Sequence, residues 1–134
     1  MNQKNSDALV FFGATGDLAH KKIFPALQAL ARRGDLDLPV IGVANAGWTL
    51  DQLKARARDS VENYGGLDPD AFDQLSRCLR YIDGDYADPA TFQKLRGELG
   101  GAERPLHYLA IPPSLFEVVI RQLGHSGCAK GARA

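Results

Sequence analysis

The sequence predicts an α/β protein built on a Rossmann-like, doubly wound parallel sheet. Four short segments, at residues 8–12, 39–44, 79–83 and 106–111, are expected to form strands. Segments whose apolar residues recur at helical spacing separate these runs, which gives the order β-α-β-α-α-β-α-β-α. Because strands that alternate with helices require right-handed crossovers, the four strands should lie parallel in one sheet with helices on both faces.

The first strand and the helix after it give the clearest pattern. Residues 8–12 are uninterruptedly apolar and end at Gly13, as expected of a central strand that helices cover on both faces. After a turn, apolar residues recur at helical spacing as far as Gly34, a residue suited to closing a helix in a left-handed conformation. These apolar residues are Ile23, Leu27, Leu30 and Ala31.

Polar side chains mark the starts of the later helices. Thr49 and Gln52 have the spacing of a capping box, and the helix that they begin should run to about Tyr64. Asp68 and Asp88 each precede a proline, and an aspartate cap followed by proline fits the first turn of a helix. Two further helices are therefore expected there.

The last helix is expected after the fourth strand. Ser114 and Glu117 repeat the capping-box spacing. The apolar face behind them is formed by Phe116, Val119, Ile120 and Leu123. We expect the α/β domain to span residues 7–124, with a flexible N-terminus at 1–6 and a mobile tail at 125–134 that includes His125.

Composition and charge are those of an ordinary globular domain. The chain has 134 residues, enough for one core, and sixteen basic residues balance sixteen acidic ones. No overall field draws it to nucleic acid or to a membrane, and its apolar runs are too short to cross a bilayer. Cys78 and Cys128 lack the spacing of a metal or redox motif, so they are interpreted as incidental thiols. A cytoplasmic protein without a metal site is the expectation.

The turn after the first strand is the segment that indicates chemistry. A strand that ends in a tight glycine turn, followed by a helix whose first amides are free, is where dinucleotides bind their pyrophosphate. Gly13 would allow the turn, Gly16 would let phosphate approach, and Ala19 would allow close packing of helix on strand. We expect amides from Gly13 to Leu18 to hold the diphosphate. The residues of this candidate site are Gly13, Ala14, Thr15, Gly16, Asp17, Leu18 and Ala19.

The spacing of this turn, G-x-x-G-x-x-A, meets the general dinucleotide fingerprint only in part. A purely structural joint between strand and helix is the alternative interpretation. For Asp17, a helix-capping role is an equal alternative to cofactor contact.

Several motifs together resemble the N-terminal region of the glucose-6-phosphate dehydrogenase family. The run from Gly13 to Ala19 is followed by Lys21-Lys22-Ile23-Phe24-Pro25, similar to the family's signature of a glycine-aspartate-leucine-alanine turn before a lysine-bearing helix. Residues 41–44 resemble the family's second strand, and residues 108–113, which end in two prolines, resemble its fourth. The resemblance extends from about Asp7 to Leu123.

This resemblance implies roles for further residues. His20 would line the cofactor groove together with the turn, and Asp85 and Tyr86 would flank the adenine. Pro112 and Pro113 would lie above the nicotinamide end. Lys22 matches a lysine that the family places near the substrate and the nicotinamide.

Each of these roles has a structural alternative. Asp85 equally fits a loop aspartate that caps the next helix, and Lys22 fits a solvated helix lysine.

One position departs from the family pattern. Where the family commonly has an arginine that grips the 2′-phosphate of NADP, this chain has Asn45. Loss of such a charge-assisted hydrogen bond would weaken NADP binding by about ten- to a hundredfold. We expect NADP as the cofactor, with a weakened preference that makes NAD possible.

The resemblance implies a parent enzyme that oxidises glucose 6-phosphate to 6-phosphogluconolactone in the pentose phosphate pathway. The family's glutamate-lysine-proline-phenylalanine-glycine and arginine-isoleucine-aspartate-histidine-tyrosine segments are absent from these 134 residues. No catalytic residue can be assigned, since His107 lies in a predicted strand and fits a packed histidine. The chain is expected to be truncated before the β+α substrate domain, to bind cofactor, and to lack turnover. Glucose 6-phosphate would bind the full-length protein.

Two alternative functions remain open. The chain could be a free-standing nucleotide-binding or sensing module without catalysis. A short-chain reductase relative would share the G-x-x-G-x-x-A turn, but the tyrosine and lysine pair that such enzymes need does not follow the fourth strand. If the sheet is truncated, its exposed edge would also allow self-association.

Overall fold

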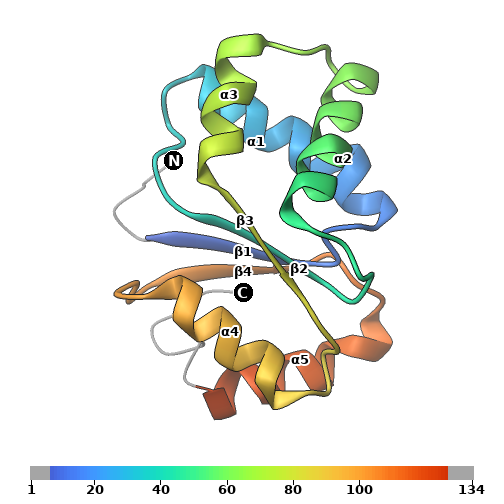
Figure 1. Ribbon diagram of the computed structural model, residues 1–134, viewed down its shortest axis with the longest axis vertical. Helices are drawn as coiled ribbons and strands as arrows, with labels where there is room; N and C mark the ends of the chain where they lie inside the picture. The colour runs from blue at the N-terminus through green and yellow to red at the C-terminus, as the bar shows by residue number, and fades with distance from the viewer. Residues whose placement is uncertain (1–6, 127–134) are drawn as a thin grey trace.

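The computed structural model describes residues 7–126, in which four parallel strands form a sheet between two layers of helices (Figure 1). The strands are β1 (Ala8–Phe12), β2 (Val40–Ala44), β3 (Leu79–Asp83) and β4 (Pro105–Leu109). Their spatial order is β3-β2-β1-β4, with β1 paired in parallel to both β2 and β4. The predicted fold class is confirmed. The fourth strand ends before its predicted limit because Pro112 and Pro113 follow it and cannot donate to a sheet.

The first two crossovers cover one face of the sheet, and the helices after β3 cover the other. Helices α1 (Phe24–Arg32), α2 (Leu50–Asn63) and α3 (Pro69–Cys78) lie on one face, whereas α4 (Pro89–Leu99) and α5 (Phe116–Ser126) lie on the other (Figure 1). Each layer has its own buried apolar cluster. The change of face occurs between β3 and β4, so the connections that leave the paired strands β1 and β4 lie on opposite faces, which is where a doubly wound sheet binds ligands.

Strand β1 joins the two layers through aromatic side chains that alternate between its faces. Phe11 packs edge-on against Phe24 of α1, with ring centroids 5.6 Å apart. Phe12 points the other way and stacks on Phe92 of α4 at 5.9 Å. All four rings are fully buried, and burying a side chain of this size contributes about 1.5–3 kcal/mol. The C-terminal end of β1 is thereby fixed relative to both helical layers.

The predicted helix starts at Thr49, Asp68 and Asp88 are confirmed. The Thr49 hydroxyl accepts from the Gln52 amide at 3.2 Å, and the Gln52 side chain accepts from the Thr49 amide at 2.8 Å. Asp68 and Asp88 accept from amides in the first turns of α3 and α4. These caps satisfy amides that a helix start would otherwise leave without partners.

The predicted start of α5 is wrong. A 3-10 turn, η3 (Pro113–Leu115), precedes the helix, and its capping position is Pro112, which provides no side-chain cap. Proline at the first helical position starts the turn one residue before Ser114, so Ser114 lies inside the turn.

The predicted apolar face and C-terminal limit of α5 also need correction. Val119 and Leu123 are buried as expected, whereas Phe116 is 36% and Ile120 is 55% exposed. The helix continues to Ser126, which places His125 in its last turn rather than in a tail.

The predictions of a flexible N-terminus at 1–6 and of a mobile tail fall largely outside the described residues. Within residues 7–126, no helix combines the length and the apolar character needed to cross a membrane.

Candidate functional site

The glycine turn brings the ends of β1, β2 and β4 together. Gly13 has a φ of +85°, and a Cβ built there would overlap the carbonyl oxygen of Ala110 at the end of β4. Its amide donates to the Val43 carbonyl and to the Tyr86 hydroxyl, both at 2.9 Å. Glycine is therefore required at position 13 by its backbone conformation and by the close approach of β4.

Part of the predicted set of free amides is already bonded within the protein. Besides Gly13, Ala14 donates to the Val43 carbonyl at 3.2 Å, and Gly16 donates to the Gly13 carbonyl at 3.0 Å. The expectation of free amides from Gly13 to Leu18 is wrong at these three positions. The protein uses them to shape the turn itself.

A helix does begin directly after the turn, as predicted. The His20 amide donates to the Gly16 carbonyl at 3.2 Å, so the amides of Asp17 and Leu18 precede the first helical hydrogen bond. Asp17 and Leu18 are exposed, while Ala19 is completely buried and allows the close packing that was predicted. The first turn is a π-helix, η2 (Ala19–Ile23), which continues into α1. The N-terminus of this helix therefore presents the amides of Asp17 and Leu18 near the carboxyl edge of the sheet, where they could donate to an anion.

A cavity of about 450 Å³ lies beside this turn, at the carboxyl ends of the strands. Its size is in the usual range for small-molecule sites. Sequence reasoning had named Gly13, Thr15, Gly16, Asn45, Asp85, Tyr86 and Pro112, all of which line the cavity. It had missed Ala44, Ala87, Ala110, Ile111, Leu115 and Val118. The missed residues are apolar and lie at strand ends, in the loop after β3, in the turn before α5 or in α5 itself, so periodicity alone does not mark them as cavity residues.

Other predicted site residues lie elsewhere. Ala14 is buried beneath the turn, where its methyl group packs near Gly42. Pro113 is exposed and begins the turn before α5. Lys22 lines a separate cavity of about 250 Å³ on the α1 face of the sheet, together with apolar residues of β1 and α1 and with Tyr108.

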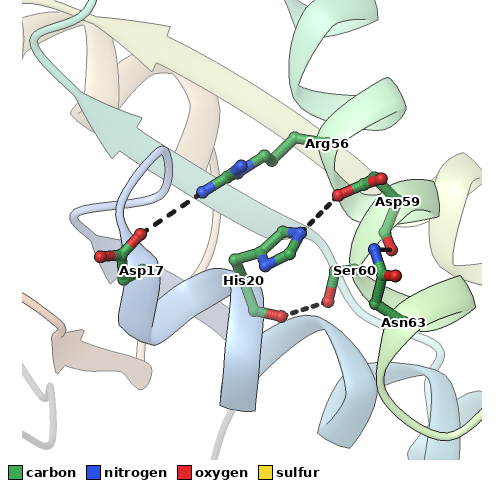
Figure 2. Close-up of polar contacts among 6 residues, drawn as sticks. All are labelled: Asp17, His20, Arg56, Asp59, Ser60 and Asn63. Carbon is green, nitrogen blue, oxygen red and sulfur yellow. Dashed lines mark hydrogen bonds and ion pairs between the residues drawn. The ribbon is translucent and has the colours of Figure 1, made fainter.

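His20, in the first turn of the helix after β1, forms hydrogen bonds with residues of α2. Its Nε2 lies 2.7 Å from the Asp59 carboxylate, and its carbonyl accepts from the Ser60 hydroxyl (Figure 2). The ring also meets the Tyr64 ring edge-on at 5.4 Å. These contacts hold the first helical turn against α2.

Arg56 of the same helix points toward the turn. Its guanidinium lies 3.8 Å from the Asp17 carboxylate (Figure 2). Because the Asp17 side chain is 93% exposed, this ion pair contributes little to stability.

Tyr86 holds the glycine turn by hydrogen bonds. Its hydroxyl accepts from the Gly13 amide and donates to the Val43 carbonyl at 3.2 Å. Burial raises the pKa of this phenol, which therefore stays neutral. Tyr86 connects the ends of β1 and β2 and forms part of the cavity wall.

Asp85 shapes the loop after β3. Its carboxylate accepts from the Ala87 amide at 2.9 Å, and its carbonyl accepts from the Asp88 amide and the Thr91 hydroxyl. The cap of α4 is Asp88, so the alternative in which Asp85 caps that helix is wrong. Asp85 is exposed on the cavity side.

His107 and Cys78, both within the described residues, do not line the cavity beside the glycine turn. His107 is buried in β4, 6.1 Å from the Phe12 ring, in agreement with a packed histidine. Burial raises the pKa of the Cys78 thiol, while Cys128 lies outside the described residues. Between Asp7 and Ser126, no group of His, Cys, Asp and Glu side chains is arranged to hold a metal ion.

Comparison with known proteins adds an independent observation to this geometry. The family model described as glucose-6-phosphate dehydrogenase, NAD binding domain, matches residues 10–134. The chain belongs to the glucose-6-phosphate dehydrogenase family. The match supports a nicotinamide dinucleotide as the class of cofactor for this domain.

Relatives of the family resemble the chain over nearly its full length. It is 41% identical over 128 residues to glucose-6-phosphate 1-dehydrogenase 1 of Mycobacterium tuberculosis, covering 96% of this chain and 28% of that protein. It is 35% identical to the Saccharomyces cerevisiae glucose-6-phosphate 1-dehydrogenase over 133 residues, covering 90% of this chain and 26% of the yeast protein.

Solved structures agree with this relationship. The crystal structure of glucose-6-phosphate 1-dehydrogenase from Mycobacterium avium matches with a TM-score of 0.91 at 45% identity, over 96% of this chain and 28% of that one. A glucose-6-phosphate dehydrogenase in complex with its substrate glucose-6-phosphate matches with a TM-score of 0.81 at 26% identity, over 95% of this chain and 29% of that one. The chain therefore spans little more than a quarter of its relatives and corresponds to their nucleotide-binding domain.

Proposed function

We propose that this chain binds a nicotinamide dinucleotide in the cavity at the carboxyl edge of the sheet. The observation that carries the proposal is the position of this cavity, beside a glycine turn and a helix start, in a chain that matches the family's NAD-binding domain. Ligands of doubly wound sheets bind at this edge, where the strand order changes direction. The bound nicotinamide would supply the hydride acceptor.

Groups in the cavity lining and at the neighbouring helix start fit the parts of a dinucleotide. The pyrophosphate would lie at Thr15 and at the amides of Asp17 and Leu18, where the helix dipole favours negative charge. Gly16 fits this role because a Cβ there would meet only the Gly13 carbonyl at 3.4 Å, which leaves its other side open to a ligand.

The two ends of the cofactor would lie on either side of the turn. The adenosine would lie near Asn45, Asp85 and Tyr86, and the nicotinamide near Pro112. We propose NADP as a cofactor whose preference is weakened by Asn45, so that NAD also binds. The missing charge-assisted hydrogen bond corresponds to about 1.5–3 kcal/mol.

The parent protein, in this proposal, is a cytoplasmic enzyme that oxidises glucose 6-phosphate to 6-phosphogluconolactone. Proton removal from the sugar hydroxyl needs a base within hydrogen-bond reach. His107 cannot serve as that base because it is 2% exposed within β4. The 134-residue chain should therefore bind cofactor without turnover, and glucose 6-phosphate should bind the longer protein.

The test is cofactor binding by two glycine variants. Gly16→Val should lose NAD and NADP binding at least tenfold, because the new side chain occupies the path of the phosphate while the fold tolerates it. Gly101→Val is the matched control, since position 101 has open space around it and precedes β4 at the opposite edge of the sheet. Binding can be followed by the shift in melting temperature that each nucleotide produces. Equal nucleotide affinity of the two variants would place the site elsewhere.

A further inference from the structure

We propose that Asp83 determines cofactor specificity: its carboxylate occupies the anion position under the loop after β2 and disfavours the 2′-phosphate of NADP relative to the 2′-hydroxyl of NAD. The inference rests on the proposed dinucleotide site and assigns the basis of its cofactor choice. It was not anticipated from the sequence, in which Asp83 ends a predicted strand.

The sheet places Asp83 next to the end of β2. Asp83 is the last residue of β3 and pairs with Ala44, the last residue of β2. The loop that leaves β2 begins at Asn45, which lines the cavity. In a doubly wound sheet the end of the second strand lies near the adenosine ribose, where the phosphate of NADP distinguishes it from NAD. Asp83 therefore lies beside the loop that would contact either the 2′-phosphate of NADP or the 2′-hydroxyl of NAD.

The amides of that loop are already bonded to the carboxylate. One oxygen of Asp83, Oδ1, accepts from the Ala46 amide at 2.9 Å, from the Gly47 amide at 2.8 Å and from the Tyr81 hydroxyl at 2.5 Å. Successive amides that converge on one point form an anion-binding concavity. Here the anion is the protein's own carboxylate, so these donors are not available to a phosphate.

The carboxylate is also charged at neutral pH. Burial by itself raises its pKa, but hydrogen bonds from the Tyr81 hydroxyl and from loop amides outweigh this effect and lower the pKa below its ordinary value of 3.8. A phosphate bound at this loop would approach a full negative charge, and Asp85 adds a second carboxylate to the cavity lining.

No compensating cation is present in the loop. Asn45, Ala46, Gly47 and Trp48 are all uncharged. Arg56 of α2 directs its guanidinium to the Asp17 carboxylate at the helix start (Figure 2). The charged groups that contact this loop or line the cavity, as far as the described residues show, are thus the carboxylates of Asp83 and Asp85.

The experiment compares nucleotide affinities of Asp83→Asn with those of the unchanged chain. Asparagine retains an oxygen that accepts from the loop amides but removes the charge. The ratio of NADP affinity to NAD affinity should rise about three- to tenfold, as expected for loss of one like charge several ångströms away in a partly solvated site. NAD affinity should stay within about twofold. Asp37→Asn is the matched control, since it makes the same change in an exposed loop at the amino edge of the sheet.

A second measurement needs no variant. Salt screens exposed charges, so raising the ionic strength should increase the NADP to NAD affinity ratio if the 2′-phosphate meets a negative field. A falling ratio would indicate a cation at the phosphate and would overturn the inference. An unchanged ratio in Asp83→Asn would also overturn it, while leaving the proposed site intact. If the unchanged chain binds neither nucleotide, the proposed function fails and the inference fails with it.

Discussion

Replacing Gly13 with alanine should destabilise the fold much more than the same change at Gly34. Both glycines have positive φ, +85° and +79°, so an alanine at either position pays a similar conformational cost. Their surroundings differ. A Cβ at Gly13 would overlap the Ala110 carbonyl oxygen and lie 2.9 Å from its carbon, whereas nothing lies within 4 Å of a Cβ at Gly34.

The expected loss of unfolding free energy follows from the positive φ and from the steric overlap with Ala110. A left-handed conformation costs a non-glycine residue about 1–2 kcal/mol, which is the whole effect expected at Gly34. At Gly13 the strand ends must also separate, which strains the amide's hydrogen bonds to Val43 and Tyr86, each contributing about 1 kcal/mol. We therefore expect a loss of about 3–4 kcal/mol for Gly13→Ala, or roughly 10–15 °C in melting temperature.

Urea unfolding followed by circular dichroism measures both variants under the same conditions. The reasoning requires a difference of at least about 1 kcal/mol in unfolding free energy between them. Equal losses in the two variants would show that the approach of β4 to the turn imposes no steric demand, and the account of why position 13 must be glycine would be wrong.

Four further outcomes follow from particular contacts. Thr49→Ala should lower the unfolding free energy by about 1 kcal/mol through loss of the helix cap; an unchanged urea midpoint would contradict this. Gly42→Ala should cost about 1–3 kcal/mol, because its Cβ would lie 2.8 Å from the Ala14 methyl group; calorimetry showing an unchanged melting temperature would refute it. Asp83 has a lowered pKa, so its contribution should be complete above about pH 5 and be lost as the pH falls below its ordinary value of 3.8. The stability gap between the unchanged chain and Asp83→Asn should therefore shrink between pH 7 and pH 3, and a constant gap in urea titrations would oppose this. Tyr108 is 47% exposed on the edge strand β4, so Tyr108→Lys should decrease self-association through that edge. Sedimentation that shows only monomers of both proteins at all concentrations would exclude self-association through β4.

The fold was predictable because its signals are local. Short segments that contain apolar residues predicted the strands, and the polar groups of Thr49, Asp68 and Asp88 marked three helix starts where the structure has caps. The failure at Ser114 has an equally local cause, because the preceding Pro112-Pro113 pair starts a turn earlier than the capping spacing indicated.

The candidate site was predictable only in part. The turn, Asn45 and Pro112 follow strand ends, and strand ends meet at one edge of a parallel sheet. The contacts of His20 with Asp59 and of Asp83 with Ala46 join residues 39 and 37 positions apart. Such pairings depend on how α2 packs against η2 and on how β3 pairs with β2, which periodicity and spacing do not specify. The same applies to Lys22, which helical spacing alone could not assign to one cavity or the other.

The most direct test of the central claim is to map the cofactor by NMR. Amide resonances of the labelled 134-residue chain would be followed during titration with NAD and, separately, with NADP. The largest changes should occur at Thr15, Asn45 and Ala87, which line the cavity at the carboxyl edge, and at Asp17 and Leu18 of the neighbouring helix start. Changes centred on the other cavity, near Lys22 and Tyr108, or no saturable changes at all, would contradict the claim that this edge binds the dinucleotide.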